Sequence, residues 1–483
     1  MWPEFFQPED LRAIMPQVQL SLFACGILLM DFLLERRHKF FNAITALVGV
    51  GFSGFALWQM RDDQALAFKG LIVVDSFFIF FSLVFLLATA LVILMSIKYM
   101  EVEDEHEGEY YALILFATVG MMFLASGVDL ITLFIGLELM AISFYLLTGY
   151  LRRDRRSNEA ALKYFLLGVF STGILAYGFS LLYGVSGSTS IYRVGDAVRQ
   201  RGPDDPIVFL AMIAVAAGVF FKVAAVPFHQ WAPDAYEGAP TPITAFISVG
   251  SKAASFALLL RLFLIPMAAL RDHWVFLLSV VAVATMTLGN LAAINQSNIK
   301  RLLAYSSIGH VGYILLGLVA NNETGRTGIA VYIFAYAAMT LGAFAVVTGM
   351  RRADMIGDTL DDMRGLIHKN PGPATLMLIF LLSLTGIPPT VGFLGKYFIF
   401  LSLIQTGHYY LAVFAALYVV VALYYYFRVV VVMFMQDERE PGKMTLAPGL
   451  LVTLAVTLLL TLAPGVYPEP LIRLAQSSIL PFR

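Results

Sequence analysis

The sequence is poor in charged residues and contains a single cysteine. Lysine, arginine, aspartate and glutamate make up 13% of its 483 residues, against about 25% in a typical soluble domain. Cys25 alone excludes an intrachain disulfide, and it excludes an iron–sulfur cluster held only by this chain, because such a cluster takes about four ligands. The net charge of −1 argues against a nucleic-acid-binding surface, so no nucleic-acid partner is expected.

Motifs for nucleotide binding and for metal binding are also missing from the sequence. There is no P-loop, no GxGxxG ahead of a helix and no HExxH. The seven histidines show no HxxxH or HxH spacing, which leaves little support for a transition-metal site. We therefore expect no cofactor and no metal on this chain, and any redox chemistry must belong to another chain.

The N-terminal segment MWPEFFQPEDLRAIMPQ is acidic and rich in proline. A cleavable signal peptide would begin with a basic region. We therefore expect the first apolar run to be retained as a membrane helix.

Hydrophobic residues dominate the chain, at 59%, and the mean hydropathy is +0.79. No water-soluble core hides this much apolar side chain, so the expected fold class is an all-α polytopic membrane protein. A spanning helix needs about 20 mostly apolar residues, and this criterion gives about fourteen transmembrane helices. They are predicted near residues 14–34, 40–59, 71–95, 110–126, 128–150, 160–184, 206–227, 241–265, 274–295, 299–320, 327–349, 373–404, 409–434 and 447–467.

Two of these predicted helices, the seventh and the twelfth, are interrupted. Pro227 lies five residues after Lys222 and leaves the carbonyl of Val223 without its helical partner. The twelfth helix carries Gly386-Ile387-Pro388-Pro389 in its first half. Broken backbone at membrane depth is tolerated only inside protein or beside a water-filled cavity, and paired broken helices are typical of inverted-repeat transporters.

The predicted organisation is a single transmembrane domain, residues 1–483. Helices 1–3 occupy residues 1–100, and helix 14 occupies residues 447–467. Broken helices 7 and 12 lie five helices apart, an odd step that inverts one relative to the other, and this spacing indicates an inverted repeat.

Lysine and arginine in the short loops predict the orientation, because they concentrate on the cytoplasmic side. With about fourteen helices the strongly basic connections all fall on one side, which places both termini on the outer side. Arg193, Arg199 and Arg201, after helix 6, are an exception. The basic connections are Arg36-Arg37 with Lys39, Arg152-Arg153 with Arg155-Arg156, Lys300-Arg301, and Arg351-Arg352 with Arg364 and Lys369.

Several ionisable residues lie inside the apolar runs. A charge at the bilayer centre costs roughly 2.5 kcal/mol or more, so such residues usually face a protein interior and often mark an ion pathway. Glu138 and Lys222 form the ion pair that we expect to act as a proton switch, because separating them lowers the lysine pKa by desolvation. The candidate pathway residues are Glu138, Lys163, Lys222, Lys252, His310 and Lys396.

Structural explanations compete with this interpretation. Glu138, Lys222, Lys252 and Lys396 could be a static set of buried charges that only specifies packing. Lys163 could extend to the cytoplasmic interface, and His310 could be an ordinary hydrogen-bonded interior histidine.

Other polar and aromatic positions favour structural roles or remain ambiguous. Asp75 and Asp129 are expected to cap helices. Lys300 and Arg301 are interpreted as topology determinants, and Arg261 and Arg428, near helix ends, remain ambiguous. Tyr424-Tyr425-Tyr426 are expected to form an interfacial aromatic belt and not a quinone site.

Four motifs together resemble the antiporter-like membrane subunits of respiratory complex I, which are related to subunits of multi-subunit Na+/H+ antiporters. The resemblance runs roughly from helix 3 to the end and is less specific before it. Two points separate the chain from subunits L and M: it has no long lateral helix after helix 14, and it has Lys396 where M carries a glutamate. The motifs are FIGLELMAISFYLL, KVAAVPFHQWAPDAYEGAPTP, NIKRLLAYSSIGHVGYILLG and LTGIPPTVGFLGKY.

The resemblance implies fourteen helices and one proton channel. It also implies two inverted repeats: helices 4–8, residues 110–265, with broken helix 7, and helices 9–13, residues 274–434, with broken helix 12. Glu138 matches the helix-5 glutamate and Lys222 the helix-7 lysine of an ion pair, with no departure at these positions. Lys163 matches the helix-6 lysine, Lys252 the connecting helix-8 lysine, His310 the helix-10 histidine and Lys396 the terminal helix-12 lysine.

The resemblance also implies partners and a location. The expected partners are antiporter-like subunit M, small subunits K and J, the lateral helix of subunit L, and the lipid of a bacterial inner membrane. NADH, FMN, iron–sulfur clusters and quinone would be bound by other subunits.

The function expected from these features is outward proton movement through a buried Glu/Lys/His relay, driven by redox chemistry on other subunits of an NADH:quinone oxidoreductase. One alternative is a subunit of a multi-subunit Na+/H+ antiporter. A second alternative is a structural scaffold subunit with static buried ion pairs. The sequence leaves open whether H+ or Na+ is coupled and which quinone the complex uses.

Overall fold

The computed structural model describes residues 7–35, 38–105, 108–351, 357–437, 444 and 446–479. In these residues the regular structure is helical apart from one hairpin of two antiparallel strands. The elements are α1 (Pro8–Ala13), α2 (Met15–Asp31), α3 (Phe40–Gln59), β1 (Ala65–Ala67), η2 (Phe68–Gly70), β2 (Ile72–Val74), α4 (Ser76–Glu103), α5 (Gly108–Ser126), α6 (Leu130–Thr148), α7 (Arg155–Ser186), α8 (Ile191–Arg201), α9 (Pro206–Val223), α10 (Trp231–Gly238), α11 (Thr241–Phe246), η3 (Ile247–Ser251), α12 (Lys252–Leu264), η4 (Ala268–Leu270), α13 (Arg271–Ile294), α14 (Ile299–Ala320), α15 (Glu323–Met350), η5 (Asp361–Met363), α16 (Leu366–Lys369), α17 (Pro371–Thr385), α18 (Val391–Gln405), α19 (Tyr409–Met435), α20 (Pro448–Val466) and α21 (Glu469–Ser477).

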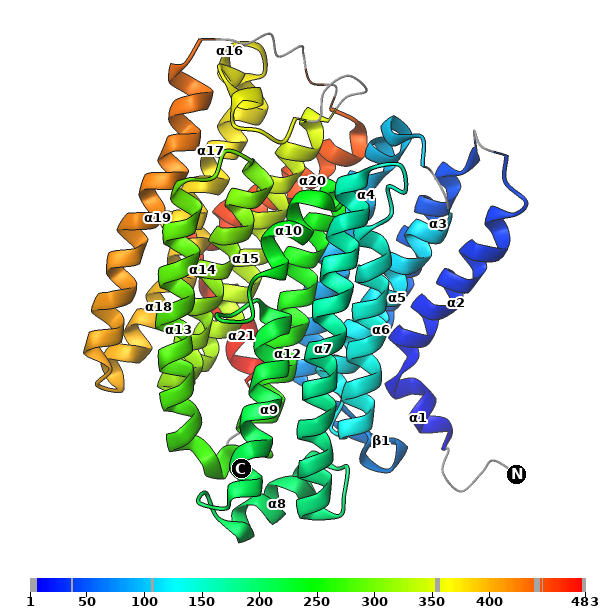
Figure 1. Cartoon of the computed structure of the whole chain (residues 1–483). Coiled ribbons are helices and arrows are strands. Elements are labelled where there is room, and N and C mark those ends of the chain that lie inside the picture. The colour runs from blue at the N-terminus through cyan, green and yellow to red at the C-terminus, as the bar shows by residue number, and fades with distance from the viewer. Residues whose placement is uncertain are drawn as a thin grey trace.

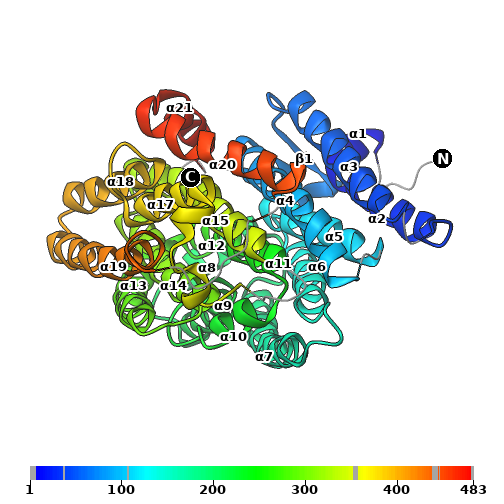
Figure 2. The same cartoon turned by 90° about the horizontal axis from the view of Figure 1, so that it is seen from above.

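The long helices stand side by side in one bundle (Figure 1). Seen from above, α2 and α3 lie at one edge, α19 lies at the opposite edge, and α11 and α12 lie near the centre (Figure 2). The run Thr241–Leu264 consists of α11, η3 and α12, and its most apolar part is fully buried. The most apolar parts of α14 and α15 are almost as buried. Polar side chains on these central helices are therefore kept away from lipid.

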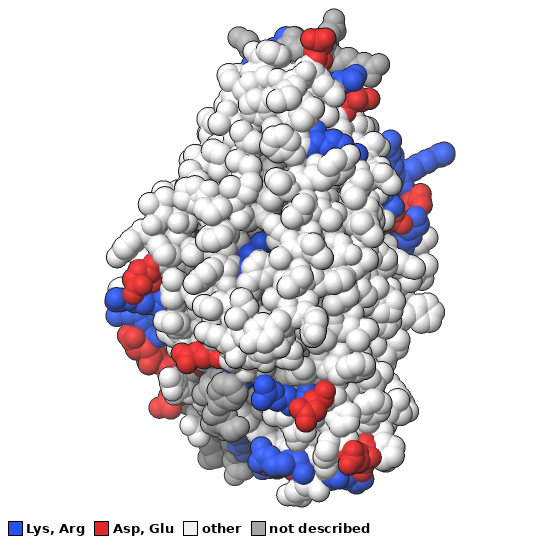
Figure 3. Space-filling model, turned by 90° about the vertical axis from the view of Figure 1, so that its left-hand side faces the viewer, with Lys and Arg blue, Asp and Glu red and all other residues white. Residues whose placement is uncertain are grey.

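Twelve described helices are long and apolar enough to cross a membrane. Three further apolar helices are shorter, and two of them, α17 and α18, replace the single overlong helix predicted at 373–404. Figure 3 shows a face whose charged side chains gather toward the ends and margins, with a small cationic patch in the broad uncharged area between them. Because charge is costly against lipid tails, this distribution suits a membrane, and the chain is an all-α polytopic membrane protein.

Polar residues fix the start of several helices. The Asp75 carboxylate accepts a hydrogen bond from the Phe78 amide at the start of α4. Asp129 accepts from the Ile131 amide at the start of α6. The prediction that Asp75 and Asp129 cap helices is therefore confirmed.

Both predicted helix breaks are present. Helix α9 ends at Val223, and Ala224 follows in the left-handed region with φ 60°. Helix α17 ends at Thr385, and Gly386 follows with φ 93°. Each helix stops just before the proline that cannot continue its hydrogen-bond ladder. Both breaks expose carbonyl groups inside the protein.

The same kind of backbone bridge occurs twice in the chain. Each residue of the second bridge follows its counterpart in the first by the same number of positions. Asp129 pairs with Ser190 in an isolated antiparallel bridge, and Asn298 pairs with Thr359 in the same way. Ser190 directly precedes α8, and Thr359 lies shortly before α16. These two helices lie at opposite ends of the bundle (Figure 1). The predicted first unit (residues 110–265) and second unit (residues 274–434) therefore carry equivalent contacts on opposite sides.

Two arginines also occupy corresponding positions in these units. Arg261 Nε donates to the Ala125 carbonyl over 2.7 Å near the end of α5. Arg428 Nη1 donates to the Ile294 carbonyl over 2.5 Å at the end of α13. Arg261 is buried and also forms an ion pair with Asp75 at 3.0 Å. Both cations serve carbonyls that a helix end leaves without partners, so these contacts resolve the ambiguity as structural.

The described basic connections lie together. Helices α7 and α14 begin, and α15 ends, at the end of the bundle drawn uppermost in Figure 1, whereas α1 and α8 lie toward the other end. Arg36, Arg37 and Arg352, which the sequence interpretation also used, lie outside the described residues.

Candidate functional site

Glu138 and Lys222 approach each other through a threonine. Lys222 is buried in the last turn of α9, and its Nζ lies 3.3 Å from Thr172 Oγ1. The same hydroxyl donates to Glu138 Oε1 over 2.9 Å. Among the described residues no ion pair within 4.0 Å joins Glu138 directly to Lys222, so the direct contact predicted from the sequence is replaced by a bridged one. A hydroxyl accepts and donates at once, and it therefore connects the amine to the carboxylate.

Lys222 lies at the end of α9, and its burial is supported by hydroxyls and an aromatic ring from other helices. The last carbonyls of a helix lack amide partners and carry a partial negative charge. Trp231 Nε1 occupies one of these carbonyls, that of Phe221, at 2.8 Å. Lys222 Nζ lies 3.4 Å from the Tyr145 hydroxyl and 5.9 Å from the centre of its ring. Acceptors and an aromatic face therefore surround the amine and stabilise its charged form.

Lys252 has hydroxyl partners. It directly follows the π-helical turn η3, and such turns are frequent at functional sites. Its side chain is buried and hydrogen-bonded to Ser307 on α14. Ser307 also accepts from the Tyr336 hydroxyl over 2.7 Å, and Tyr336 bonds to Ser248 over 2.7 Å. No carboxylate is among the described partners of this lysine, so its environment differs from that of Lys222.

His310 is held between two tyrosines. Its Nδ1 lies 2.7 Å from the Tyr332 hydroxyl and its Nε2 lies 3.2 Å from the Tyr426 hydroxyl. Tyr426 is also hydrogen-bonded to Ser306. Because both ring nitrogens have hydroxyl partners, the tautomer depends on which phenol donates. His310 thus joins a buried hydroxyl network.

The prediction that Tyr424, Tyr425 and Tyr426 form an aromatic belt is wrong for two of the three residues. Tyr424 is 61% exposed, but Tyr425 and Tyr426 are 1% and 2% exposed. Three successive residues on a helix point in directions about 100° apart, so they cannot share one lipid-facing surface. Only Tyr424 suits a belt. The 3.6-residue period of a helix is the sequence signal that could have shown that Tyr424 and Tyr426 lie on different faces.

A small cavity lies between Lys252 and His310. Both side chains line it, with Ser307 and Tyr336. Its volume, counted as the space open to the centre of a water molecule, is about 10 Å³, and a water needs about 10–15 Å³ on this measure. The cavity is therefore near the size of one water molecule beside two ionisable groups.

Lys396 binds the second helix break. Its Nζ donates to the carbonyls of Leu384 at 3.0 Å and Thr385 at 2.6 Å, at the end of α17. The amine also lies 5.0 Å from the centre of the Tyr313 ring. The break therefore supplies the acceptors that a buried lysine needs. Gly386 is the residue directly after these carbonyls.

The predicted residues fall into separate groups. Glu138 and Lys222 form one group, Lys252 and His310 border one cavity, and Lys396 lies apart on its carbonyls. No hydrogen bond among the described residues joins Lys222 to Lys252.

A series of neighbouring aromatic rings, those of Phe221, Trp231 and Tyr236, runs from Lys222 to Lys252. The rings of Tyr164 and Trp231 stack with centroids 4.3 Å apart, and the Tyr236 ring centre lies 5.6 Å from Lys252 Nζ.

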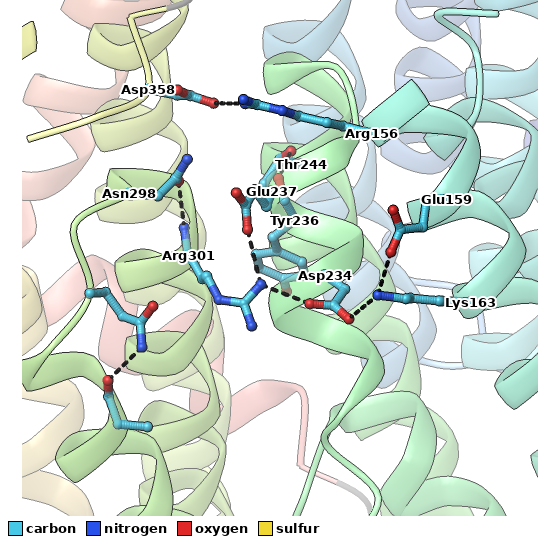
Figure 4. Close-up of polar contacts among 12 residues, drawn as sticks. Arg156, Glu159, Lys163, Asp234, Tyr236, Glu237, Thr244, Asn298, Arg301 and Asp358 are labelled. Atoms are coloured by element: carbon cyan, nitrogen blue, oxygen red, sulfur yellow. Dashed lines mark hydrogen bonds and ion pairs between the residues drawn. The ribbon is translucent and has the colours of Figure 1, made fainter. Parts of the chain in front are cut away.

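Lys163 lies outside the buried groups. Its side chain is 46% exposed and pairs with Glu159 at 2.8 Å and with Asp234 at 3.0 Å. Figure 4 shows the Asp234 carboxylate between Lys163 on α7 and Arg301 on α14. Lys163, expected among the pathway residues, is thus half-exposed and contacts Asp234, a residue that sequence reasoning missed.

Lys300 and Arg301 do more than mark topology. Lys300 is 4% exposed and its Nζ donates to the Ala239 carbonyl at 2.7 Å. Arg301 pairs with Asp234 at 2.7 Å and Glu237 at 2.9 Å. Although burial raises the pKa of the Asp234 carboxyl, hydrogen bonds from Arg301 and Lys163 outweigh it and lower that pKa below its usual value.

No group of three or more His, Cys, Asp or Glu side chains that could hold a metal occurs in the part of the chain that the structure describes. Around Lys222, Lys252 and Lys396, the described side chains offer amines, hydroxyls, the His310 imidazole and the Glu138 carboxylate. These groups accept and release protons.

Comparisons with known proteins define the class. The family described as NADH:quinone oxidoreductase/Mrp antiporter, TM, matches residues 127–422. The fold is similar to a chain in the structure of the Mrp complex from Dietzia sp., with a TM-score of 0.81 and 21% identity, covering 96% of this chain and 97% of that chain. The chain belongs to this class of antiporter-like membrane proteins.

Closer relatives narrow the family. NADH-quinone oxidoreductase subunit N 2 from Solibacter usitatus is 57% identical and covers 98% of each chain. A chain of respiratory complex I from Thermus thermophilus with bound aureothin has a TM-score of 0.81 and 32% identity, covering 96% of this chain and all (100%) of that chain. The chain therefore belongs to the subunit N family of NADH-quinone oxidoreductase.

Proposed function

We propose that this chain is a proton-translocating membrane-arm subunit of NADH:quinone oxidoreductase. It moves H+ outward through buried Glu, Lys and His side chains, and redox chemistry on other subunits supplies the drive. The observation that carries the proposal is the hydrogen-bonded series Glu138–Thr172–Lys222. The series joins an acid to a buried amine through a group that can pass a proton.

The first step is the release of a proton from Lys222. A change of charge arriving from a neighbouring membrane subunit perturbs Glu138 and weakens its hold on Lys222 through Thr172. Desolvation then disfavours the charged amine. Moving one charge against 100 mV costs about 2.3 kcal/mol, so the transfer needs this external drive.

The later steps use the hydroxyl-rich centre. Lys252 takes up the proton, and water and His310 carry it toward Lys396. The cavity between Lys252 and His310, which is near the size of one water, supports this order. Lys163 is assigned to the same route, at its half-exposed margin.

The proposal includes the membrane organisation. Fourteen crossing segments result when α2 and the pair α17–α18 are each counted as one crossing beside the twelve long helices. The repeated bridges Asp129–Ser190 and Asn298–Thr359 support two inverted repeats, residues 110–265 and 274–434, between helices 1–3 (residues 1–100) and helix 14. The parity of fourteen crossings and the basic connections support both termini on the outer side of a bacterial inner membrane.

The proposed partners and cofactors are those that the family resemblance implies. Antiporter-like subunit M, small subunits K and J and the lateral helix of subunit L would contact this chain. NADH, FMN, iron–sulfur clusters and quinone would be bound elsewhere in the complex.

The test measures proton translocation by the assembled enzyme in vesicles. Glu138→Gln and Lys222→Met should each abolish or sharply reduce the protons moved per NADH oxidised. Glu469→Gln, which removes one carboxylate of an exposed ion pair with Arg473, is the control and should leave the ratio unchanged. A normal ratio in both Glu138 and Lys222 variants would overturn the proposal.

The same preparation separates the alternatives. Na+-dependent transport in vesicles lacking the NADH-oxidising subunits would favour a Na+/H+ antiporter subunit, an alternative supported by the fold shared with the Mrp complex. Full activity after substitution of Glu138, Lys222, Lys252 and Lys396 together would favour a scaffold with static charges.

A further inference from the structure

The short helix α10 is tied to both units of the chain through one carboxylate. Asp234 Oδ2 lies 3.0 Å from Lys163 Nζ on α7, and Asp234 Oδ1 lies 2.7 Å from Arg301 Nη1 on α14 (Figure 4). Helix α7 belongs to the first unit and α14 to the second. Glu159 and Glu237 complete the charge set by pairing with Lys163 and Arg301.

Packing at the end of α10 reinforces this attachment. A Cβ added to Gly238 would lie 2.4 Å from Ala160 Cβ and 2.5 Å from the Arg156 carbonyl oxygen. Only glycine allows this close approach to α7. On the α14 side, Lys300 Nζ donates to the Ala239 carbonyl at 2.7 Å. Helix α10 is thus held between α7 and α14 along its length.

Other side chains of α10 reach the two central lysines. Trp231 Nε1 donates to the carbonyl of Phe221, the residue before Lys222. The Tyr236 ring lies 5.6 Å from Lys252 Nζ. A displacement of α10 therefore alters the surroundings of both amines at once.

We propose that Asp234 is a positioning residue that holds α10 between the two units and so sets the surroundings of Lys222 and Lys252. The ion pairs lie at the rim, where Lys163 is 46% and Arg301 is 30% exposed. Asp234 does not itself carry the proton past these lysines. This inference rests on the proposed function, because it assigns Asp234 to the same route.

The experiment compares Asp234→Asn, Asp234→Glu and the control Glu469→Gln in the purified intact complex reconstituted in vesicles. Amide hydrogen exchange is measured by mass spectrometry in residues 231–239. Protons moved per NADH, turnover and the KM for quinone are measured in parallel. Asp234→Glu keeps the charge and serves as the conservative rescue.

In Asp234→Asn we expect exchange in residues 231–239 to accelerate about fivefold, which corresponds to a loss of roughly 1 kcal/mol from partly exposed ion pairs. Turnover and protons per NADH should fall together, while the KM for quinone stays unchanged. Asp234→Glu should restore most of both, and Glu469→Gln should change neither.

Two outcomes overturn the inference, and they are distinct from failure of the proposed function. Unchanged exchange in Asp234→Asn would show that the carboxylate does not hold α10. Faster exchange with normal proton movement would show that the position of α10 does not govern the route. Failure of the proposed function is recognised separately, by a normal proton ratio in both Glu138→Gln and Lys222→Met, which do not touch the ion pairs of α10.

Discussion

Ser307 stands in α14 where Glu138 stands in α6. Each lies at the same distance along the chain from the residue that caps its helix, Asn298 or Asp129. Each also belongs to the polar group of a buried lysine. Lys222 reaches Glu138 through Thr172, and Lys252 bonds to Ser307 directly. The two equivalent positions therefore serve two different lysines of the first unit: Lys222 is linked to a carboxylate on α6, and Lys252 bonds to a neutral hydroxyl on α14.

Thr172→Val should interrupt the first group without removing either charge. Valine has nearly the same shape but no hydroxyl, and a hydrogen bond to a charged group contributes roughly 1.5 kcal/mol or more, so proton translocation should fall about tenfold. Translocation by vesicles containing the complex is the measurement. Thr172→Ser keeps the hydroxyl and should retain most of the rate; equal rates for the valine and serine variants would contradict the bridge.

Tyr426→Phe should impair proton movement because it removes the hydroxyl that bonds His310 Nε2 and Ser306. An unpaired buried polar group costs about 1–3 kcal/mol, so translocation should fall about fivefold or more.

The neighbouring tyrosines supply matched controls measured in the same vesicles. Tyr425→Phe removes a hydrogen bond of 3.2 Å to Asn290 and leaves the Tyr426 hydroxyl on His310 in place. Tyr424→Phe removes an exposed hydroxyl. Loss of the same size in all three variants would exclude a specific role for Tyr426.

Gly386→Ala should displace Lys396. A Cβ at this position would lie 2.8 Å from Lys396 Cδ, and the backbone φ of 93° disfavours any side chain. The strain should cost roughly 1–2 kcal/mol of stability and weaken the bonds of Lys396 to the carbonyls of α17, so both thermal stability and proton translocation should fall. Gly372→Ala, with open space around its Cβ, is the control and should leave both unchanged.

The attachment of α10 should not respond to pH between 6 and 8. Arg301 also pairs with Glu237, and Lys163 also pairs with Glu159. Hydrogen bonds from Arg301 and Lys163 lower the pKa of the Asp234 carboxyl. A group with a lowered folded pKa stabilises above its unfolded pKa, and this contribution is lost only as the pH falls below about 4. Amide exchange in residues 231–239, corrected for the intrinsic effect of pH, is the measurement. Protection that disappears between pH 8 and 6 would show that another group controls this helix.

The sequence predicted most of the membrane architecture and less of the site. The spans followed from apolar length, and the helix ends at Val223 and Thr385 followed from the prolines beyond them, because both are local properties of the chain. The burial of Lys222, Lys252 and Lys396 was also predictable, since a charge in an apolar run must turn inward.

The residues that contact the buried lysines and His310 were not predictable from the sequence in the same way. Thr172 and Lys222 are far apart along the chain, and hydrophobic periodicity indicates which face of a helix is buried but not what it meets. Tyr426, expected at the lipid surface, turned out to bond His310, because only the rotation of α19 against α14 decides which tyrosine points inward. Apolar length and proline thus determined the spans and breaks from the sequence alone. The tertiary packing of helices decided which hydroxyls, rings and carbonyls surround each lysine, since those contacts join side chains that no local rule connects.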